Sequence, residues 1–313
     1  MKKMIAAVLC AILLLGCFSG CGKKDDAELH IVTTIFPMYD WVREILGANP
    51  GNVKITMLMD NGVDLHSYQP TADDIITISS CDMFIYAGGD SDSWAEDVLK
   101  QAKNDKMVVI DLLELLGDKA LCPEHDHHEE EEHHHKHDEH VWLSLKNAAF
   151  FCGQIRDGLA QLDAEHKEIY EANADRYISQ LSDLDKQYES VAAAAKKDTV
   201  LFGDRFPFLY LFHDYGISCH AAFSGCSAES EASFETVTRL AGVVDTHNLQ
   251  YVMTIDGSKN NIATAIIQAT KNKNQQVLSM DSLQSVTAQE VKDGQTYLNT
   301  MEANLAVLEK ALG

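Results

Sequence analysis

Residues 165–197 read EHKEIYEANADRYISQLSDLDKQYESVAAAAKK and contain neither proline nor glycine. Apolar side chains recur there at the spacing of one helix face: Tyr170, Ala174, Tyr177, Ile178, Leu181, Leu184, Tyr188 and Val191. A helix of this length is far longer than a crossover between two strands needs. A coiled coil is the alternative, but it needs a partner and only one such segment exists. The stretch predicts a rigid helix that joins two lobes.

Short apolar, β-branched runs alternate with helical stretches on both sides of this helix. We expect strands at 29–35, 53–58, 83–86 and 107–110, and then at 199–202, 251–255 and 276–280. Such alternation is typical of parallel sheets covered by helices. The predicted fold class is α/β, with two similar lobes of mostly parallel sheets flanked by helices and joined by one long rigid helix. Ligands in such architectures bind outside the carboxyl ends of the strands, in the cleft.

The N-terminus indicates the compartment. Lys2 and Lys3 precede an apolar run, 4–15, that is too short to span a bilayer and is followed by Gly16 and Cys17. This ending resembles a bacterial lipobox, which implies a signal peptide at 1–16, an acylated Cys17 and an extracytoplasmic chain anchored to the membrane by lipid. Cys21 is the alternative lipidation site, and an ordinary cleaved secretory signal is the other interpretation.

The predicted organisation follows from these features. After the signal peptide we expect a tether at 17–27, an N-terminal lobe at 28–164, the linking helix at 165–197 and a C-terminal lobe at 198–313. About 290 residues beyond the leader and tether are enough for two domains.

A tract rich in histidine and acid lies within the first lobe. Glu124–His140 reads EHDHHEEEEHHHKHDEH and holds eight of the fourteen histidines. Imidazoles and carboxylates are ligands for Zn²⁺ and its neighbours, so a dense run offers many weak overlapping sites. A solvated acidic loop is the alternative, and either way the composition predicts disorder at 124–137. The accessory metal-binding histidines would be His125, His127, His128, His133, His134, His135 and His137.

The charge of the chain favours cations as partners. The formal net charge is −23, and it becomes −25 when residues 1–16 and their two lysines are removed. So acidic a surface argues against nucleic acid.

Five cysteines remain beyond the leader and tether. Disulfides are permitted outside the cytosol, and Cys219 with Cys226 is the closest-spaced pair. Cys122 with Cys152, across the histidine tract, is a second possibility. An odd count leaves at least one thiol free or intermolecular.

Two segments carry the resemblance to a known family. Asp64–Thr71, DLHSYQPT, is similar to the D-P-H-x-Y-E-P-T segment of the zinc and manganese receptors of ABC transporters, and His140–Leu143, HVWL, is similar to their H-V-W-L segment. Together with the lipobox, the acidic histidine loop and the long helix, the resemblance covers essentially the whole mature chain. It implies two α/β lobes bridged by a rigid helix, with one metal between them.

The resemblance also implies a ligand set. His66 and His140 match the first two ligands, and Asp281, just after the last predicted strand, matches a carboxylate from the C-terminal lobe. By itself, each of these has a simpler interpretation: a solvent-exposed or capping loop histidine for His66, the last residue of the tract for His140, and a helix N-cap for Asp281.

The chain departs from the family at the third ligand. Arg205 stands where the family has His or Glu, and a guanidinium is permanently protonated and cannot bind a cation. We expect Arg205 to pair with a neighbouring acid. The third ligand is then a water or another side chain, with Glu231 the favoured carboxylate and Asp204, Glu229 and the Cys226 thiolate as alternatives, whereas His213 is expected to pack on a helix.

The implied function is capture of Zn²⁺ and its delivery to an ABC permease by a monomeric, non-enzymatic receptor. Zinc is favoured over manganese or iron by the imidazoles and the histidine loop, and affinity is expected to fall below about pH 6.5, where imidazoles protonate. The rivals are a manganese or iron receptor, a metal-binding surface adhesin and, less favoured without an HExxH motif, a metallohydrolase.

Overall fold

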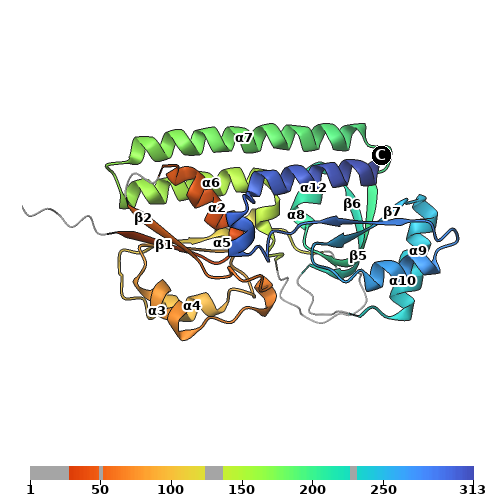
Figure 1. Ribbon diagram of the computed structural model, residues 1–313, viewed down its shortest axis with the longest axis horizontal. Coiled ribbons are helices and arrows are strands. Elements are labelled where there is room, and N and C mark those ends of the chain that lie inside the picture. Colours follow the sequence, from red (N-terminus) through yellow and green to blue (C-terminus); the bar gives the residue numbers. More distant parts are fainter. Residues whose placement is uncertain (1–27, 49–51, 124–136, 226–230) are drawn as a thin grey trace, which may run out of the picture.

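The computed structural model describes residues 28–48, 52–123, 137–225 and 231–313. Figure 1 shows two α/β lobes side by side, with one long helix running over both. The predicted signal peptide, tether and lipidation sites Cys17 and Cys21 lie outside the described residues, as does most of the histidine tract. Within the described part of the chain, no helix is both long and apolar enough to cross a membrane.

Each lobe is built on a four-stranded parallel sheet. The first sheet has the order β2-β1-β3-β4, from β1 (Leu29–Thr33), β2 (Val53–Met57), β3 (Met83–Tyr86) and β4 (Val108–Asp111). The second repeats that order as β6-β5-β7-β8, from β5 (Thr199–Phe206), β6 (Ser218–Ser224), β7 (Tyr251–Ile255) and β8 (Gln276–Met280). The fold class predicted from the sequence is therefore confirmed.

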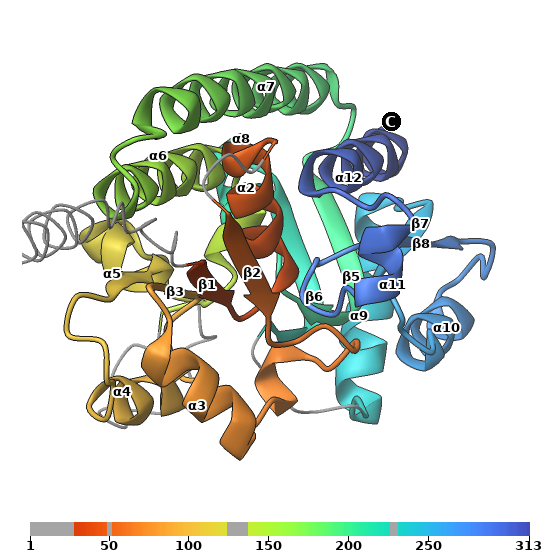
Figure 2. The ribbon, with the colours of Figure 1, turned by 60° about the vertical axis from the view of Figure 1, so that its left-hand side comes forward.

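Helices cover both faces of each sheet (Figure 2). In the first lobe α2 (Phe36–Leu46) and α6 (Leu145–Leu162) pack on one face, and α3 (Ala72–Ser80) and α4 (Trp94–Leu99) lie on the other. In the second lobe α8 (Leu209–Tyr215) and α12 (Tyr297–Leu312) are opposed by α9 (Phe234–His247) and α10 (Asn261–Ala269). The short elements are α5 (Leu112–Leu116), α11 (Ala288–Lys292) and the 3-10 turns η2 (Leu65–Ser67), η3 (Gly117–Lys119) and η4 (Val141–Leu143).

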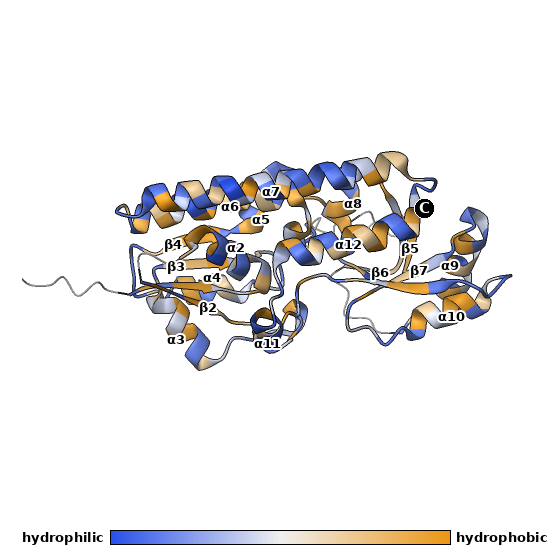
Figure 3. Cartoon of the chain, turned by 45° about the horizontal axis from the view of Figure 1, so that its top comes forward, coloured by the Kyte–Doolittle hydropathy of each residue, from blue (hydrophilic) through white to orange (hydrophobic). Residues whose placement is uncertain are grey.

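Helix α7 (Lys167–Ala194) is the predicted linking helix. Its 28 residues correspond to about 42 Å, and it contacts α2, α6, α8 and α12. It ends before 197 because the backbone N–H groups of Lys196 and Lys197 donate to the carbonyl of Leu312 instead of continuing the helix. The apolar stripe is buried and the outer face is hydrophilic, as Figure 3 shows.

One hydrophobic core runs through both lobes under α7. Its packing sets the position of one lobe relative to the other. Tyr297, at the start of α12, inserts into the first lobe, where its ring packs edge-on against Trp41 at 5.2 Å and its N–H donates to Asp40. Its hydroxyl donates to the carbonyl of Trp142, and the Trp142 indole N–H donates to the carbonyl of Ser282 at 2.9 Å. Helix α12 therefore belongs to the packing of both lobes, and the limits 28–164, 165–197 and 198–313 stay a prediction.

The sequence missed one strand. β6 lies at the edge of its sheet, and its sequence, SCHAAFS, mixes small and polar residues with few β-branched ones. Its backbone pairs with β5 over six residue positions, so tertiary pairing makes it a strand against its weak local preference. His213 lies on a helix, α8, but its side chain is exposed and not packed as expected from the sequence.

Candidate metal site

His66 is held by a short turn after β2. The Asp64 side chain caps η2, with Oδ1 accepting the N–H of His66 at 3.0 Å, and Leu65 anchors the turn in the core. On the ring, Nδ1 lies 2.7 Å from Ser91 Oγ and 3.8 Å from a Glu139 carboxylate oxygen. The side chain is 11% exposed, so its free edge faces the space between the lobes.

His140 is fully buried directly before η4. Its Nδ1 lies 2.9 Å from Asp138 Oδ1, and the same carboxylate oxygen accepts its backbone N–H, also at 2.9 Å. Gly225, at the end of β6, lies against this ring: a Cβ there would come within 3.0 Å of His140 Cε1. A Cβ would also come within 2.7 Å of the Phe206 carbonyl oxygen, so the glycine lets the second lobe pack closely on its own strand and on the His140 ring.

The two rings converge on one point. Nε2 of His66 and Nε2 of His140 are 3.2 Å apart, with the rings inclined at 64°. Two nitrogens bound to one tetrahedral zinc at about 2.0 Å each would be about 3.3 Å apart. When both Nδ1 atoms donate their protons outward, to Ser91 and Asp138, both Nε2 lone pairs face the same position. Outer hydrogen bonds of this kind fix the tautomer of metal-binding histidines.

The electrostatics keep His66 in the form that binds metal. Burial, followed by the neighbouring His140 ring, lowers the pKa of His66 to about 4, and Arg205 adds to this effect while Asp64 and Asp138 oppose it. The imidazole is therefore neutral at physiological pH, as a ligand must be.

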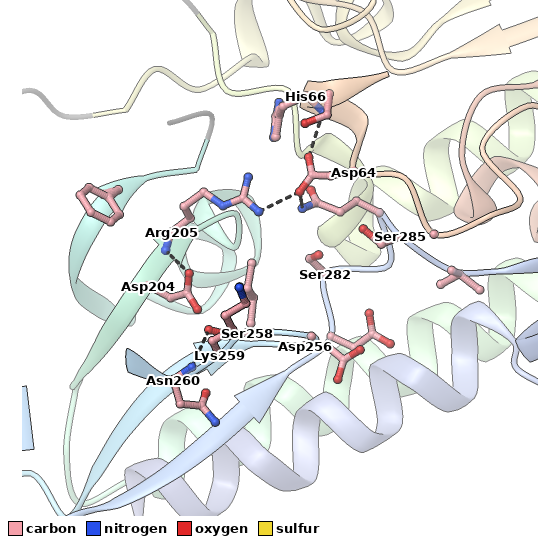
Figure 4. Close-up of a pocket in the computed structure, with 18 of the residues that line it drawn as sticks. Asp64, His66, Asp204, Arg205, Asp256, Ser258, Lys259, Asn260, Ser282 and Ser285 are labelled. Atoms are coloured by element: carbon pink, nitrogen blue, oxygen red, sulfur yellow. Dashed lines mark hydrogen bonds and ion pairs between the residues drawn. The ribbon is translucent and has the colours of Figure 1, made fainter. Parts of the chain in front are cut away.

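A cleft of about 740 Å³ opens beside His66, between the lobes. Figure 4 shows its walls, which come from the loops after β2, β7 and β8 and from the end of β5. All of these are carboxyl ends of strands, where the two-lobed pattern predicts the ligand.

Asp281 lines the same cleft, although its oxygens have other partners. Oδ1 accepts the N–H of Leu283 at 2.7 Å and Oδ2 accepts the Gln295 amide at 3.2 Å. Burial raises the pKa of Asp281, and Asp256 and Glu290 add to the effect. Across the described ranges, no three His, Cys, Asp or Glu side chains converge as a ready-made metal site. The structure thus brings together His66 and His140 and leaves Asp281 across the cleft.

Arg205 pairs with an acid, as the sequence predicts, and the acid is Asp64 of the opposite lobe. One guanidinium nitrogen lies 2.7 Å from Asp64 Oδ2. Asp204 also lines the cleft; its Oδ1 accepts the N–H of Arg205, while its buried Oδ2 has no hydrogen-bond partner among the described residues.

The favoured third ligand, Glu231, is not placed for that role. It is exposed, just ahead of α9, and does not line the cleft. Asp204, which lines the cleft, is the better candidate. Cys226 and Glu229 lie outside the described residues.

The accessory histidines are largely beyond description. His125, His127, His128, His133, His134 and His135 lie outside the described residues. His137 is exposed, with Nδ1 3.4 Å from the Sγ of Cys122.

The predicted disulfides require correction. Cys122 and Cys152 are free, because Cys122 is exposed whereas Cys152 is fully buried on α6 within the core. Cys219 is also a free thiol, on β6, and its expected partner Cys226 is outside the described part of the chain.

Sequence reasoning missed the residues that support the ligands. Asp138 and Glu139 stand directly before His140, and the two-residue spacing of Asp138 and His140 matches a local Asx turn that could have been recognised. Ser91 and Gln284 carry no such signal, because only the fold brings them to His66 and Asp64.

Comparison with known proteins agrees with this architecture. Residues 31–311 match the family model described as zinc-uptake complex component A periplasmic (ZnuA). The chain is 31% identical over 316 residues to the zinc-binding lipoprotein AdcA of Streptococcus pneumoniae R6, covering 99% of this chain and 61% of that protein. It is 30% identical over 319 residues to the high-affinity zinc uptake system protein ZnuA of Bacillus subtilis 168, covering 99% and 96%. The chain thus spans about three-fifths of the length of its AdcA relatives.

Solved structures show the same fold. The Zn(II)-bound ZnuA-like domain of Streptococcus pneumoniae AdcA superposes with a TM-score of 0.73 at 27% identity, covering 91% of this chain and 99% of that one. The metal-dependent lipoprotein YcdH of Bacillus subtilis gives a TM-score of 0.75 at 26% identity, again covering 91% and 99%. The chain belongs to the ZnuA family of zinc-uptake components.

Proposed function

We propose that this chain is an extracytoplasmic receptor that captures Zn²⁺ between its lobes and delivers it to an ABC permease. The observation that carries the proposal is the His66 and His140 pair, whose Nε2 atoms lie 3.2 Å apart with both Nδ1 atoms held from behind. This is ligand geometry for one borderline-soft cation. Two relatives with "zinc" in their names, at 30% and 31% identity, support the choice of metal.

The site is completed from the second lobe. Asp281 can keep the N–H of Leu283 on one oxygen and offer the other to the metal in place of the Gln295 amide. Asp204 has a buried oxygen without a hydrogen-bond partner among the described residues, in the wall of the same cleft. We assign Asp281 as the carboxylate ligand from the C-terminal lobe, and Asp204 or a water as the third ligand, the role expected of Glu231.

Capture, in this proposal, needs no bond making beyond coordination. The ion meets the two imidazoles first, because both rings are already oriented and the His66 ring is neutral. The carboxylates then reach it by a small movement of the end of β5 and of the loop after β8, which shields the ion from water. The loaded receptor, anchored through Cys17, docks on the permease. The histidine tract 124–137 raises the local supply of zinc.

Metal content and competition titration test the proposal, on the chain from residue 28 with 124–136 deleted. We expect one tightly held zinc per chain, and a loss of at least 100-fold in affinity in both H66A and H140A. H213A is the matched control, because His213 is exposed on α8, away from the cleft. If the deletion alone abolishes tight binding, the tract is the metal site and the receptor assignment fails.

A further inference from the structure

Three contacts from both lobes meet on the carboxylate of Asp64. Oδ1 caps the turn that carries His66, accepting its N–H at 3.0 Å. Oδ2 accepts from the Arg205 guanidinium at 2.7 Å and from the Gln284 amide at 3.0 Å, both in the second lobe. Figure 4 shows the bond between Arg205 and Asp64 crossing the cleft. The ligand turn of one lobe is thus bound to the other lobe through a single side chain.

The backbone of the second lobe is shaped to deliver Arg205. The register between β5 and β6 shifts between Phe202 and Arg205. Gly203, inside the shift, packs so tightly against α10 that an added Cβ would come within 2.8 Å of the Ala263 nitrogen. Asp204 Oδ1 then accepts the N–H of Arg205. The register shift and the hydrogen bond from the Arg205 N–H thus accompany a backbone conformation in which the Arg205 side chain lines the cleft.

The position of Gln284 is also fixed by its surroundings. It is 4% exposed and follows Leu283, whose φ of 61° is a rare conformation for a branched side chain. That conformation is held by the bond from the N–H of Leu283 to Asp281 Oδ1. Asp281, the proposed ligand, therefore also sets the turn that brings Gln284 to Asp64.

An ordinary surface ion pair would explain the distance alone, and most such pairs contribute little. Here the acceptor also caps the ligand turn and takes a second hydrogen bond from Gln284, which an isolated surface pair would not do. The resemblance to the family further implies that Arg205 stands where a metal ligand would be. A fixed cation thus joins the lobes at this position.

We propose that Arg205 is a positioning residue which, with Gln284, holds Asp64 and the His66 turn against the second lobe before metal arrives, in place of a third imidazole ligand. The inference rests on the proposed zinc-binding function. Its consequence is a receptor whose imidazole pair is organised without metal and whose zinc, lacking the third imidazole, exchanges faster than it would with histidine at 205.

Backbone hydrogen exchange on the metal-free protein tests the first part. The N–H groups of His66 and Ser67, which donate to Asp64 Oδ1 and to the Asp64 carbonyl, report on the turn. We expect at least tenfold faster exchange in R205A and in Q284A, and a smaller increase in R205K, which keeps the charge. R156A is the matched control, since Arg156 pairs with Asp157 on the surface of α6. Unchanged protection in R205A and Q284A, both shown to be folded by circular dichroism, would overturn the proposal.

Zinc release tests the second part. With R205H, which restores an imidazole, we expect release to a chelator at least tenfold slower than from the parent chain. R205K should not slow it. Equal release rates for the parent and R205H would refute the replacement of a ligand by a positioning residue. The two proposals fail separately: if H66A and H140A leave zinc binding intact, the receptor function falls, whereas the exchange result on the metal-free protein still decides the role of Arg205.

Discussion

Nε2 of His66 and Nε2 of His140 lie 3.2 Å apart although 74 positions separate them in the chain. Each ring is oriented by a neighbour of its own, Ser91 for the first and Asp138 for the second. Both residues and both supporting side chains belong to the first lobe, so the pair is a product of two separately braced loops of that lobe.

The lowered pKa of His66 makes a prediction about acid. Its folded-state value of about 4 lies below the ordinary 6.5, so the ring stays neutral at pH 5.5. We expect the His66 imidazole protons to titrate near pH 4 by NMR in the metal-free protein. Zinc binding should then persist well below pH 6.5, the limit expected for ordinary imidazoles, which lose about tenfold per pH unit. Titration near 6.5 would contradict the burial argument.

The lowered pKa of His66 also makes the stability of the metal-free protein depend on pH. Because the unfolded chain takes up this proton from about pH 6.5 downward and the folded one only near 4, His66 destabilises the metal-free protein as pH falls through that window.

For Asp92 we expect the opposite dependence of stability on pH. It is 1% exposed, its Oδ2 accepts the N–H groups of Ala87 and Gly88, and burial raises its pKa to about 7. The folded protein keeps a proton that the unfolded chain loses above 3.8, so stability falls as pH rises from about 4 to 7. We expect D92N to remove this loss. Its unfolding free energy relative to that of the parent should be higher at pH 8 than at pH 4 by on the order of 2–4 kcal/mol. Denaturant titrations at both values measure it, with the exposed D118N as control; equal slopes for D92N and the parent would show that Asp92 is ionised throughout.

We expect one indole hydrogen bond to stabilise the contact between the two lobes. Trp142 Nε1 donates to the Ser282 carbonyl, whereas Trp41 Nε1, equally buried, has no hydrogen-bond partner among the described residues. W142F leaves a buried carbonyl unsatisfied and should cost about 1–3 kcal/mol of unfolding free energy beyond the loss of ring volume. W41F removes the same atoms without breaking a hydrogen bond, so the difference between the two variants isolates it. Equal losses would mean that packing alone holds this interface.

We expect alanine substitutions at two glycines to have opposite effects on stability. At Gly203 an added Cβ would collide with the backbone of Ala263 on α10, and helix and strand would have to separate. We expect G203A to destabilise the protein by about 2 kcal/mol or more and to weaken zinc binding, because Asp204 and Arg205 move with β5. At Gly153, within α6, nothing lies within 4 Å. G153A should stabilise by about 0.5–1 kcal/mol. Thermal unfolding of both variants tests the pair, and a stable G203A would show that β5 and α10 are not in close contact.

The free cysteines should differ sharply in reactivity. Burial raises the pKa of the Cys81 thiol to about 12 and raises those of Cys152 and Cys219 well above the usual value, whereas Cys122 is exposed. A thiolate reagent should therefore label Cys122 in the folded chain and leave the other three intact until unfolding. Mass spectrometry of labelled peptides, with C122S as control, checks this; rapid labelling of Cys152 would mean that α6 opens readily.

The local sequence determined the long helix and most of the strands. Helix α7 follows from an apolar stripe without proline or glycine. Seven of the eight strands in the described part of the chain carry enough apolar, β-branched residues to be recognised. β6 was missed because a polar edge strand owes its conformation to β5. His66 and His140 could be named because each sits in a motif that the chain shares with a family.

Tertiary structure decided the rest, because contacts between distant residues leave no periodic trace in a sequence. Arg205 could be predicted to pair with an acid, but only the register shift in β5 selects Asp64, 141 positions away. The family pattern pointed to Asp281, but only the fold shows its oxygens bonded to Leu283 and Gln295. The sequence by itself thus determined which chemistry the chain carries, and the packing of the two lobes decided which groups face each other, because burial and distance arise only when they meet.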